Sequence, residues 1–191
     1  MRNLSLIGAG FVGLVLILLF GVRAPAMTDI MKGADVQADP KEVKSILATF
    51  DQAEETLRTE SLSGLMAIYS KSYRHRGLRK EDTSRIWEDI FARYDRLSSR
   101  HFFSKIVVEK KMSQKATAQV TCTGGLFGIS ALKKEGKPSP AAQTEEPVHH
   151  IDVWFEAVHH LVLEEGSWKI IGHDPAGGEE DPFGVAIHLL F

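Results

Sequence analysis

Residues 149–164 read HHIDVWFEAVHHLVLE, and this stretch decides the class of the fold. Its odd positions are nearly all apolar, and a period of two is typical of a β-strand with one buried face. Glu165 and Gly166 then favour a turn, after which Trp168-Lys169-Ile170-Ile171 begins another strand. We therefore expect a long antiparallel hairpin whose odd-numbered side chains, Phe155 and His159 among them, point inward.

Two further strands are predicted before this hairpin. Residues 115–123, KATAQVTCT, alternate strictly and place Val120 and Cys122 on the buried face. Gly124-Gly125 indicates a bulge, after which the strand continues to residue 132. Residues 101–109 form an earlier strand, and residues 133–147, with three prolines, form the hairpin loop.

Helical spacing dominates the chain before residue 100. Asp39 is predicted to cap a first helix with Pro40 in its first turn, Ser61 a second helix, and a third begins near Asp82. A short strand or turn is expected between residues 70 and 78. Three helices followed by long antiparallel strands predict an α+β fold, with the helices packed against the sheet.

The first 26 residues differ from all the others. Between Arg2 and Arg23 lie 20 uncharged residues, enough for a hydrophobic helix across the roughly 30 Å hydrocarbon layer of a membrane. Ala24-Pro25-Ala26 also resembles a signal-peptide cleavage site. Residues 1–26 are thus either a signal peptide or a signal anchor. In both cases we expect export to the periplasm or cell envelope, cleaved and soluble or anchored in the inner membrane, with residues 27–39 as a tether.

Composition excludes several classes of protein. The net charge is −2, so the chain lacks the basic excess of a nucleic-acid-binding protein. A single cysteine rules out a disulfide framework and a multi-cysteine zinc module. The sequence from Gly8 to Gly13 matches G-x-G-x-x-G, but no βαβ pattern surrounds it, so it predicts no dinucleotide site. We expect no cofactor. We expect no metal site either, because adjacent strand histidines such as His149 and His150 point to opposite faces.

One stretch resembles a known family. Residues 50–77, from Phe50-Asp51 through Leu65-Met66-Ala67-Ile68-Tyr69 to Tyr73-Arg74-His75-Arg76-Gly77, look like the first helices and short strand of nuclear transport factor 2-like domains. The ending Trp168-Lys169-Ile170-Ile171-Gly172-His173 resembles the last strand of that family. The resemblance covers residues 41–174 and implies a domain over about 40–174, followed by a tail over 175–191. It implies a cone-shaped α+β barrel, with a pocket between the helices and a curved sheet. It also implies a tendency to form dimers through the sheet.

The pocket is the candidate site. The third helix and the odd face of residues 149–164 are the two largest apolar surfaces, so we expect them to bury each other around one cavity. Five residues are predicted to line or border it: Tyr73, His75, Trp87, Phe155 and His159. We expect non-catalytic binding of a small apolar molecule or a protein partner. The alternative is an isomerase or lyase that uses His75 or another buried titratable group. Cys122 is expected to be buried and inert.

A homodimer is also predicted. If the odd positions of residues 149–164 face the core, then Trp154, Val158 and Val162 lie on the outer face among charged residues. Exposed apolar groups on a sheet face are typical of an interface. A two-fold dimer through this face is one interpretation, and coverage by residues 185–191 is the other.

Overall fold

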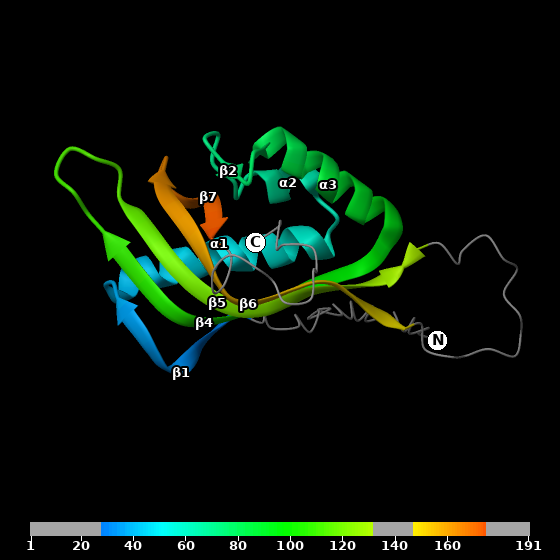
Figure 1. Ribbon diagram of the computed structural model, residues 1–191, viewed down its shortest axis with the longest axis horizontal. Helices are drawn as coiled ribbons and strands as arrows, with labels where there is room; N and C mark the ends of the chain where they lie inside the picture. The colour runs from blue at the N-terminus through cyan, green and yellow to red at the C-terminus, as the bar shows by residue number, and fades with distance from the viewer. Residues whose placement is uncertain (1–27, 132–146, 175–191) are drawn as a thin grey trace, which may run out of the picture.

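The computed structural model describes residues 28–131 and 147–174. Figure 1 shows its elements, which follow one another in this order: β1 (Thr28–Gln37), α1 (Pro40–Arg58), α2 (Leu62–Met66), β2 (Arg74–His75), β3 (Leu78–Arg79), α3 (Lys80–Arg93), β4 (Tyr94–Glu109), β5 (Thr117–Ser130), β6 (Val148–Glu164) and β7 (Ser167–Asp174). The predicted leader, the loop over residues 132–146 and the tail over 175–191 lie outside the described residues. Within the described ranges, no helix is long and apolar enough to span a membrane.

The helices begin where the sequence predicts. The Asp39 carboxylate accepts hydrogen bonds from the backbone N–H groups of Lys41 and Glu42, and Glu42 bonds back to the Asp39 N–H. This capping box satisfies donors that the first turn of α1 leaves open. The Ser61 hydroxyl caps α2 in the same manner. The third helix begins at Lys80, slightly earlier than predicted, because Asp82 accepts the Arg79 N–H from inside the first turn.

The sheet is five-stranded and mixed. Its order is β1-β4-β5-β6-β7, with β4 to β7 antiparallel and β1 parallel to β4. The tether predicted for residues 27–39 is therefore wrong over residues 28–37, which form the edge strand β1. Most side chains of β1 are exposed on both faces, so its sequence carries no alternation that would indicate a strand.

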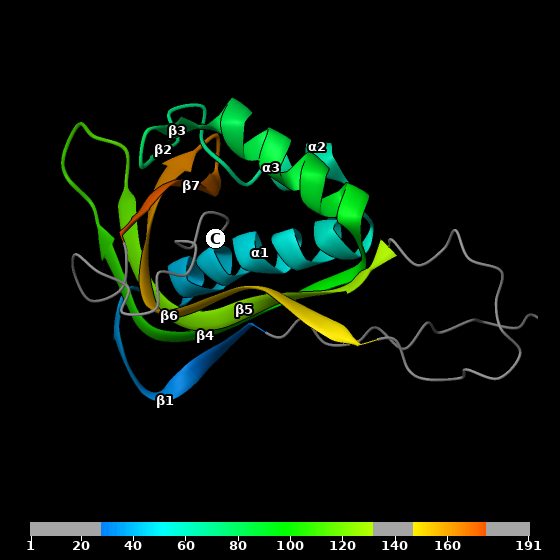
Figure 2. The same cartoon turned by 45° about the vertical axis from the view of Figure 1, so that its right-hand side comes forward.

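Bulges give the sheet its curvature. One extra residue, Ser104, interrupts the pairing of β4 with β5, and an extra residue at Phe155–Glu156 interrupts the pairing of β6 with β5. Glu156 has a φ of 50°, and its carboxylate accepts a hydrogen bond from the Ser104 hydroxyl at 2.9 Å. Because bulges increase local twist and bend a strand, this linked pair lets the sheet wrap around α1, as Figure 2 shows.

The core lies between the concave face of the sheet and the helices. Phe50 of α1 packs against Phe103 of β4 with ring centroids 4.9 Å apart. At the middle of α1 the Thr49 hydroxyl donates to the Trp168 carbonyl, and farther along the Glu54 carboxylate accepts two hydrogen bonds from Ser99. The α+β class, with three helices packed against a curved, mostly antiparallel sheet, is thus confirmed.

The predicted facing of residues 149–164 is correct only from Ala157 to Leu161, because beyond that stretch Val162 is buried and Leu163 is 36% exposed. Ala157, His159 and Leu161 point inward and are buried, as expected. Before this stretch the order is reversed: Trp154 is 4% exposed, whereas Phe155 is 72% exposed. The extra residue at 155–156 shifts the alternation by one position, and a shift of one exchanges the two faces. The outer placement of Trp154, on which the dimer prediction relied, is therefore wrong.

Candidate functional site

A chain of buried polar side chains crosses the concave face from β5 to β7. The Cys122 Sγ lies 3.0 Å from Nε2 of His159, and Nδ1 of His159 lies 2.9 Å from Nδ1 of His173. At one end Trp154 donates its indole N–H to Cys122 Sγ at 3.1 Å. At the other end Nδ1 of His75 donates to the His173 carbonyl at 3.0 Å. We call Cys122, Trp154, His159, His173 and His75 the histidine cluster.

The contacts of His159 restrict where its proton lies. A neutral imidazole has one N–H donor and one acceptor nitrogen, and both nitrogens of His159 have partners. If the Cys122 thiol donates to Nε2, then Nδ1 carries the proton and donates to His173. If Nε2 donates to the sulfur, then His173 must donate in return. The neutral chain therefore has two self-consistent arrangements, which differ in the direction of every hydrogen bond from Cys122 to His173.

Strand register brings the two central histidines together. After the turn at Glu165 and Gly166, β7 pairs with β6 until Leu161 lies opposite Ile170, and Ile171 is then an extra residue. This bulge moves His173 directly opposite His159. Phe50 of α1 covers the pair from the helix side, with its ring centroid 5.7 Å from that of His159. Both sides of the cluster are thus fixed by regular structure.

An aromatic row extends the cluster toward α3. Trp87 donates its indole N–H to the Tyr69 hydroxyl at 3.0 Å. The rings of Tyr69 and Tyr73 lie 5.0 Å apart, and Tyr73 lies 5.8 Å from the His173 ring. The Ser70 N–H donates to the Ile170 carbonyl and the Ile170 N–H donates to the Ile68 carbonyl, which holds this segment against β7. The row therefore connects the third helix with the histidine cluster across the interior.

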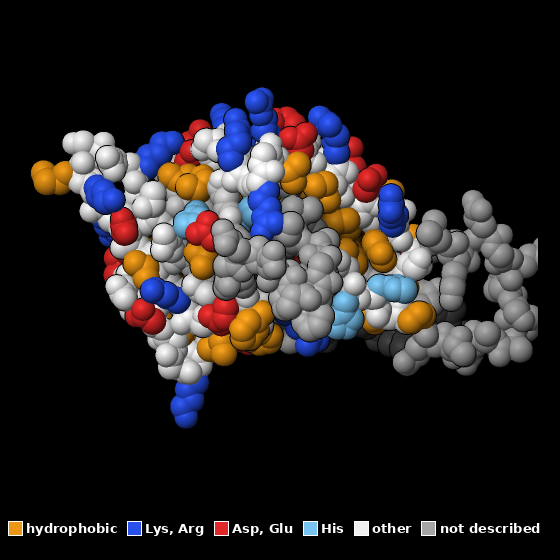
Figure 3. Space-filling view, in the orientation of Figure 1, with side chains coloured by type: hydrophobic (Ala, Val, Ile, Leu, Met, Phe, Trp, Pro, Cys, Tyr) orange, Lys and Arg blue, Asp and Glu red, His pale blue; other side chains and the backbone are white. Residues whose placement is uncertain are grey.

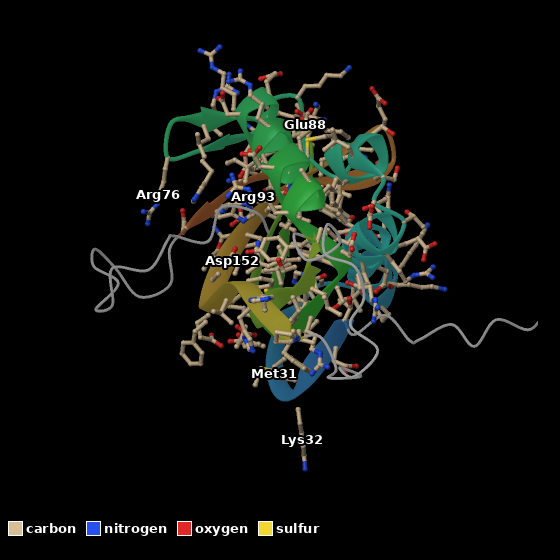
Figure 4. The ribbon with its side chains drawn as sticks, turned by 90° about the vertical axis from the view of Figure 1, so that its right-hand side faces the viewer. Met31, Lys32, Arg76, Glu88, Arg93 and Asp152 are labelled. Atoms are coloured by element: carbon tan, nitrogen blue, oxygen red, sulfur yellow. The ribbon has the colours of Figure 1, made fainter. Side chains whose placement is uncertain are left out.

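Burial keeps the thiol and phenols of this region neutral. Desolvation raises the pKa of the Cys122 thiol to about 12, against which the hydrogen bond from Trp154 acts weakly. Burial likewise raises the pKa of Tyr73 to about 12, and that of Tyr69 well above its usual value. The negative charge of Asp152 adds to the shift at Tyr69. Figure 4 shows Asp152 on β6, below Arg93 at the end of α3.

The structure brings four of the five predicted site residues together. Tyr73, His75, Trp87 and His159 all belong to the histidine cluster or to its aromatic row, and each is buried. Phe155 does not belong there. The bulge at 155–156 turns its ring to the outer face of the sheet, so its assignment to the pocket is wrong.

Sequence reasoning missed the residues that join these four. His173 is the centre of the cluster, but without the extra residue at Ile171 it would not lie opposite His159, and no sequence signal marks that bulge. Trp154 was assigned to the wrong face for the same kind of reason. Cys122 was correctly predicted to be buried, yet its neighbours His159 and Trp154 depend on cross-strand register. His101, whose Nδ1 lies 3.8 Å from Cys122 Sγ, is a further neighbour.

The chemistry available to the cluster is hydrogen bonding and proton transfer. The thiol is held as a neutral donor, so it is a poor nucleophile. Within residues 28–131 and 147–174, no group of three or more His, Cys, Asp or Glu side chains is arranged to hold a metal ion. Imidazoles in both tautomers, phenols and indoles can instead position an uncharged molecule or exchange a proton with it.

Comparisons with known proteins concern the fold. No family model matches the sequence, and no curated protein does. Similar solved structures include Bd1075 from Bdellovibrio bacteriovorus, with a TM-score of 0.47, 9% identity and 74% of this chain covered. This chain spans only 42% of that protein. Aln2 from a Streptomyces species has a TM-score of 0.47 and 14% identity, and the match covers 72% of this chain and 90% of Aln2.

A third similar structure is a protein of the nuclear transport factor 2-like family from Streptomyces avermitilis. Its TM-score is 0.47 and its identity 15%, and the match covers 71% of this chain and 95% of the other. At these identities we derive neither a ligand nor an activity from the three proteins.

Proposed function

We propose that this chain is an exported protein of the cell envelope whose domain binds a small uncharged molecule in the interior of the cone, beside the histidine cluster. The observation that carries this proposal is the continuous row of polar side chains from Trp154 through Cys122 and His159 to His173. It crosses the concave face, where a core that served packing alone would consist of apolar side chains.

Energetics support a binding role for the cluster. Burying a hydroxyl, amide or imidazole without full compensation costs roughly 1–3 kcal/mol per group, so polar groups gathered in an interior are retained where they serve a purpose. The thiol and phenols are neutral, which favours an uncharged ligand over an ionic one. The sequence suggested an apolar ligand, but these side chains fit a molecule that both donates and accepts hydrogen bonds.

Native mass spectrometry of the full chain, released from mild detergent, tests binding. We expect a bound mass above that of the polypeptide, which is lost in His159→Phe, because phenylalanine fills the space but accepts no hydrogen bond. Met112→Ala is the matched control, since Met112 is 98% exposed and lies in the turn between β4 and β5. A wild-type chain that carries no ligand, or a His159→Phe chain that keeps it, contradicts the proposal.

Export is tested separately with a reporter fused after Phe191. The reporter should be active only outside the cytoplasm, because residues 1–26 combine a basic start with a long uncharged run. Activity in the cytoplasm contradicts export and leaves the interior binding site unaffected.

Acid–base catalysis is a second candidate function. It is favoured by the two hydrogen-bond arrangements that the neutral histidine cluster can adopt. Passing from one arrangement to the other exchanges the tautomer of both rings while each keeps one proton, so His173 can alternate between donor and acceptor at Nδ1. An isomerase needs such a group: it removes a proton from a carbon next to a carbonyl and returns one elsewhere, with no net change of protons.

A β,γ-unsaturated cyclic ketone is a suitable probe of this candidate, because its conversion to the conjugated ketone raises ultraviolet absorbance. If catalysis occurs, His173→Gln should lower the rate by about 10²–10⁴-fold, the usual contribution of a positioned acid or base. The exposed His150, replaced by Gln, is the control. Equal rates for both variants and for buffer alone leave binding without catalysis.

A further inference from the structure

We propose that the outer face of the sheet rests on the membrane surface, with aromatic and cationic side chains around the start of β1 in contact with lipid. This inference rests on the proposed export, with residues 1–26 retained as an anchor. The first step concerns distance. Five residue steps separate Arg23, at the end of the uncharged run, from Thr28, so the two lie at most about 18 Å apart.

Thr28 does not lie at a remote tip of the domain. It pairs with His101 in the middle of β4, His101 pairs with Gly124, and Gly124 pairs with Trp154. The strand start is therefore level with the middle of the sheet. A short connection to the membrane places this part of the sheet close to the lipid headgroups, and the helices cover only the other face (Figure 1).

The outer face at this level carries exposed apolar side chains. Val153 and Phe155 flank Trp154 in sequence and are 55% and 72% exposed. Beside them the Arg100 guanidinium lies 5.7 Å from the centroid of the Phe127 ring, which is 4.9 Å from that of His150. We call Val153, Phe155, Arg100, Phe127 and His150 the outer patch. In Figure 3, hydrophobic and histidine side chains lie next to one another at the end of the molecule where β6 begins.

The bend of β1 adds a second contact on the other side of Thr28. The pairing of β1 with β4 is interrupted between Ile30 and Asp35, and Gly33 has a φ of 85°. Met31 and Lys32 in this bend project away from the helices, as Figure 4 shows. An apolar side chain beside a lysine is suited to the boundary between acyl chains and anionic headgroups. The outer patch and the bend thus flank the point where the anchor joins.

Charge on this face is compatible with a lipid surface. Arg100 and Lys32 attract anionic headgroups, at about 1 kcal/mol for each cation near the surface. Of the nearby carboxylates, Glu156 accepts hydrogen bonds from Ser104 and Thr123, and Asp29 is an exposed acid at the edge of the sheet. Because the anchor holds the patch at a high effective concentration, a contact too weak for a free domain is sufficient here.

The test uses the full chain in vesicles of phosphatidylcholine and phosphatidylglycerol, about 3:1, with and without brominated acyl chains. Phe155→Trp places a fluorophore on the outer patch, and Met112→Trp places one at another exposed site, in the turn between β4 and β5. With the wild-type signal as background, we expect brominated lipid to quench the Phe155→Trp variant about twofold more than the Met112→Trp variant.

The outcomes separate this inference from the proposed function. Equal quenching of both variants in chains that float with the vesicles overturns the lipid contact and leaves the anchor and the interior site intact. Chains that do not float overturn the anchor and the lipid contact together, while binding of the ligand is measured independently. Cross-linked pairs with an unquenched Phe155→Trp overturn the inference in favour of contact between two copies.

Discussion

The two halves of β6 differ in which of their positions, odd or even, face the core. From Ala157 to Leu161 the strand follows the alternation of its sequence, and His159 and Leu161 point inward. Before Glu156 the same rule fails, because Trp154 is buried and Phe155 exposed. The sequence pattern is equally regular on both sides of the bulge. The comparison shows that the two-residue hydrophobic period predicts a strand but not which of its side chains face the core, since one extra residue exchanges the two faces.

Trp154 and Phe155 give the largest expected contrast. Trp154→Ala should lower the free energy of unfolding by about 3–5 kcal/mol, because it leaves a cavity beside Cys122 and removes a buried hydrogen bond. Phe155→Ala should change it by no more than about 0.5 kcal/mol, as is usual for exposed positions. Urea denaturation followed by circular dichroism measures both values.

The same pair tests the facing of the strand directly. If the simple alternation held along the whole of β6, Phe155→Ala would be the damaging substitution and Trp154→Ala the mild one. Equal losses would also contradict the bulge. Neither outcome depends on a ligand, because the comparison concerns only which ring fills the core.

The elements were predictable because their signals are local. Asp39, Ser61 and the strict alternation of residues 115–123 each act within a few residues, so helix starts and strand β5 follow from the sequence. The site was predictable in part: Trp87 and His159 were found as inward residues of amphipathic elements, and Tyr73 and His75 from the segment that resembles the short first strand of nuclear transport factor 2-like domains.

The rest of the site depends on relations between strands. The position of His173 opposite His159 requires an extra residue at Ile171, and the facing of Trp154 requires one at 155–156. Both extra residues belong to the curvature of the sheet around α1, to which many side chains contribute. The edge strand β1 was not predicted, because it forms by pairing with β4 and its side chains are mostly exposed, so its sequence shows no buried face.

The backbone at Glu156 provides the next contrast. Its φ of 50° lies in the left-handed region, which costs a side-chain-bearing residue about 1–2 kcal/mol and a β-branched residue more. Glu156→Val should therefore be less stable than Glu156→Gly by about 1–2 kcal/mol, although both lose the hydrogen bonds from Ser104 and Thr123.

Thermal unfolding of the two Glu156 variants measures this difference. At an ordinary position inside a strand the order would be the opposite, since valine favours strands and glycine weakens them. A valine variant as stable as the glycine variant would show that the bulge is not held at Glu156.

The homodimer stays a prediction with a changed basis. Trp154 is not on the outer face, so Trp154→Asp would unfold the domain instead of separating two protomers. Of the three residues predicted for that face only Val158 remains there, and Val153 and Phe155, the residues that we place against lipid, join it. Phe155→Asp is accordingly the informative substitution: by light scattering in detergent, a dimer through this face would become a monomer.

The smallest expected effect concerns Cys122, which both halves of β6 enclose. Its pKa is raised from 9.0 to about 12 by burial, so the folded state keeps the thiol proton at pH values where the unfolded state has lost it. The contribution of the Cys122 thiol to the free energy of unfolding is fully present below pH 9 and falls as the pH rises from 9 toward 12. At pH 9.5 the loss should be about 0.8 kcal/mol relative to pH 7. Cys122→Ala removes this dependence, and subtracting its unfolding free energies at the two pH values from those of the wild type cancels the other titrating groups. If the wild type loses as much unfolding free energy between the two pH values as Cys122→Ala does, the sulfur is not enclosed between Trp154 and His159. The same conclusion follows if the thiol reacts with a disulfide reagent at pH 8 as fast in the folded state as in urea.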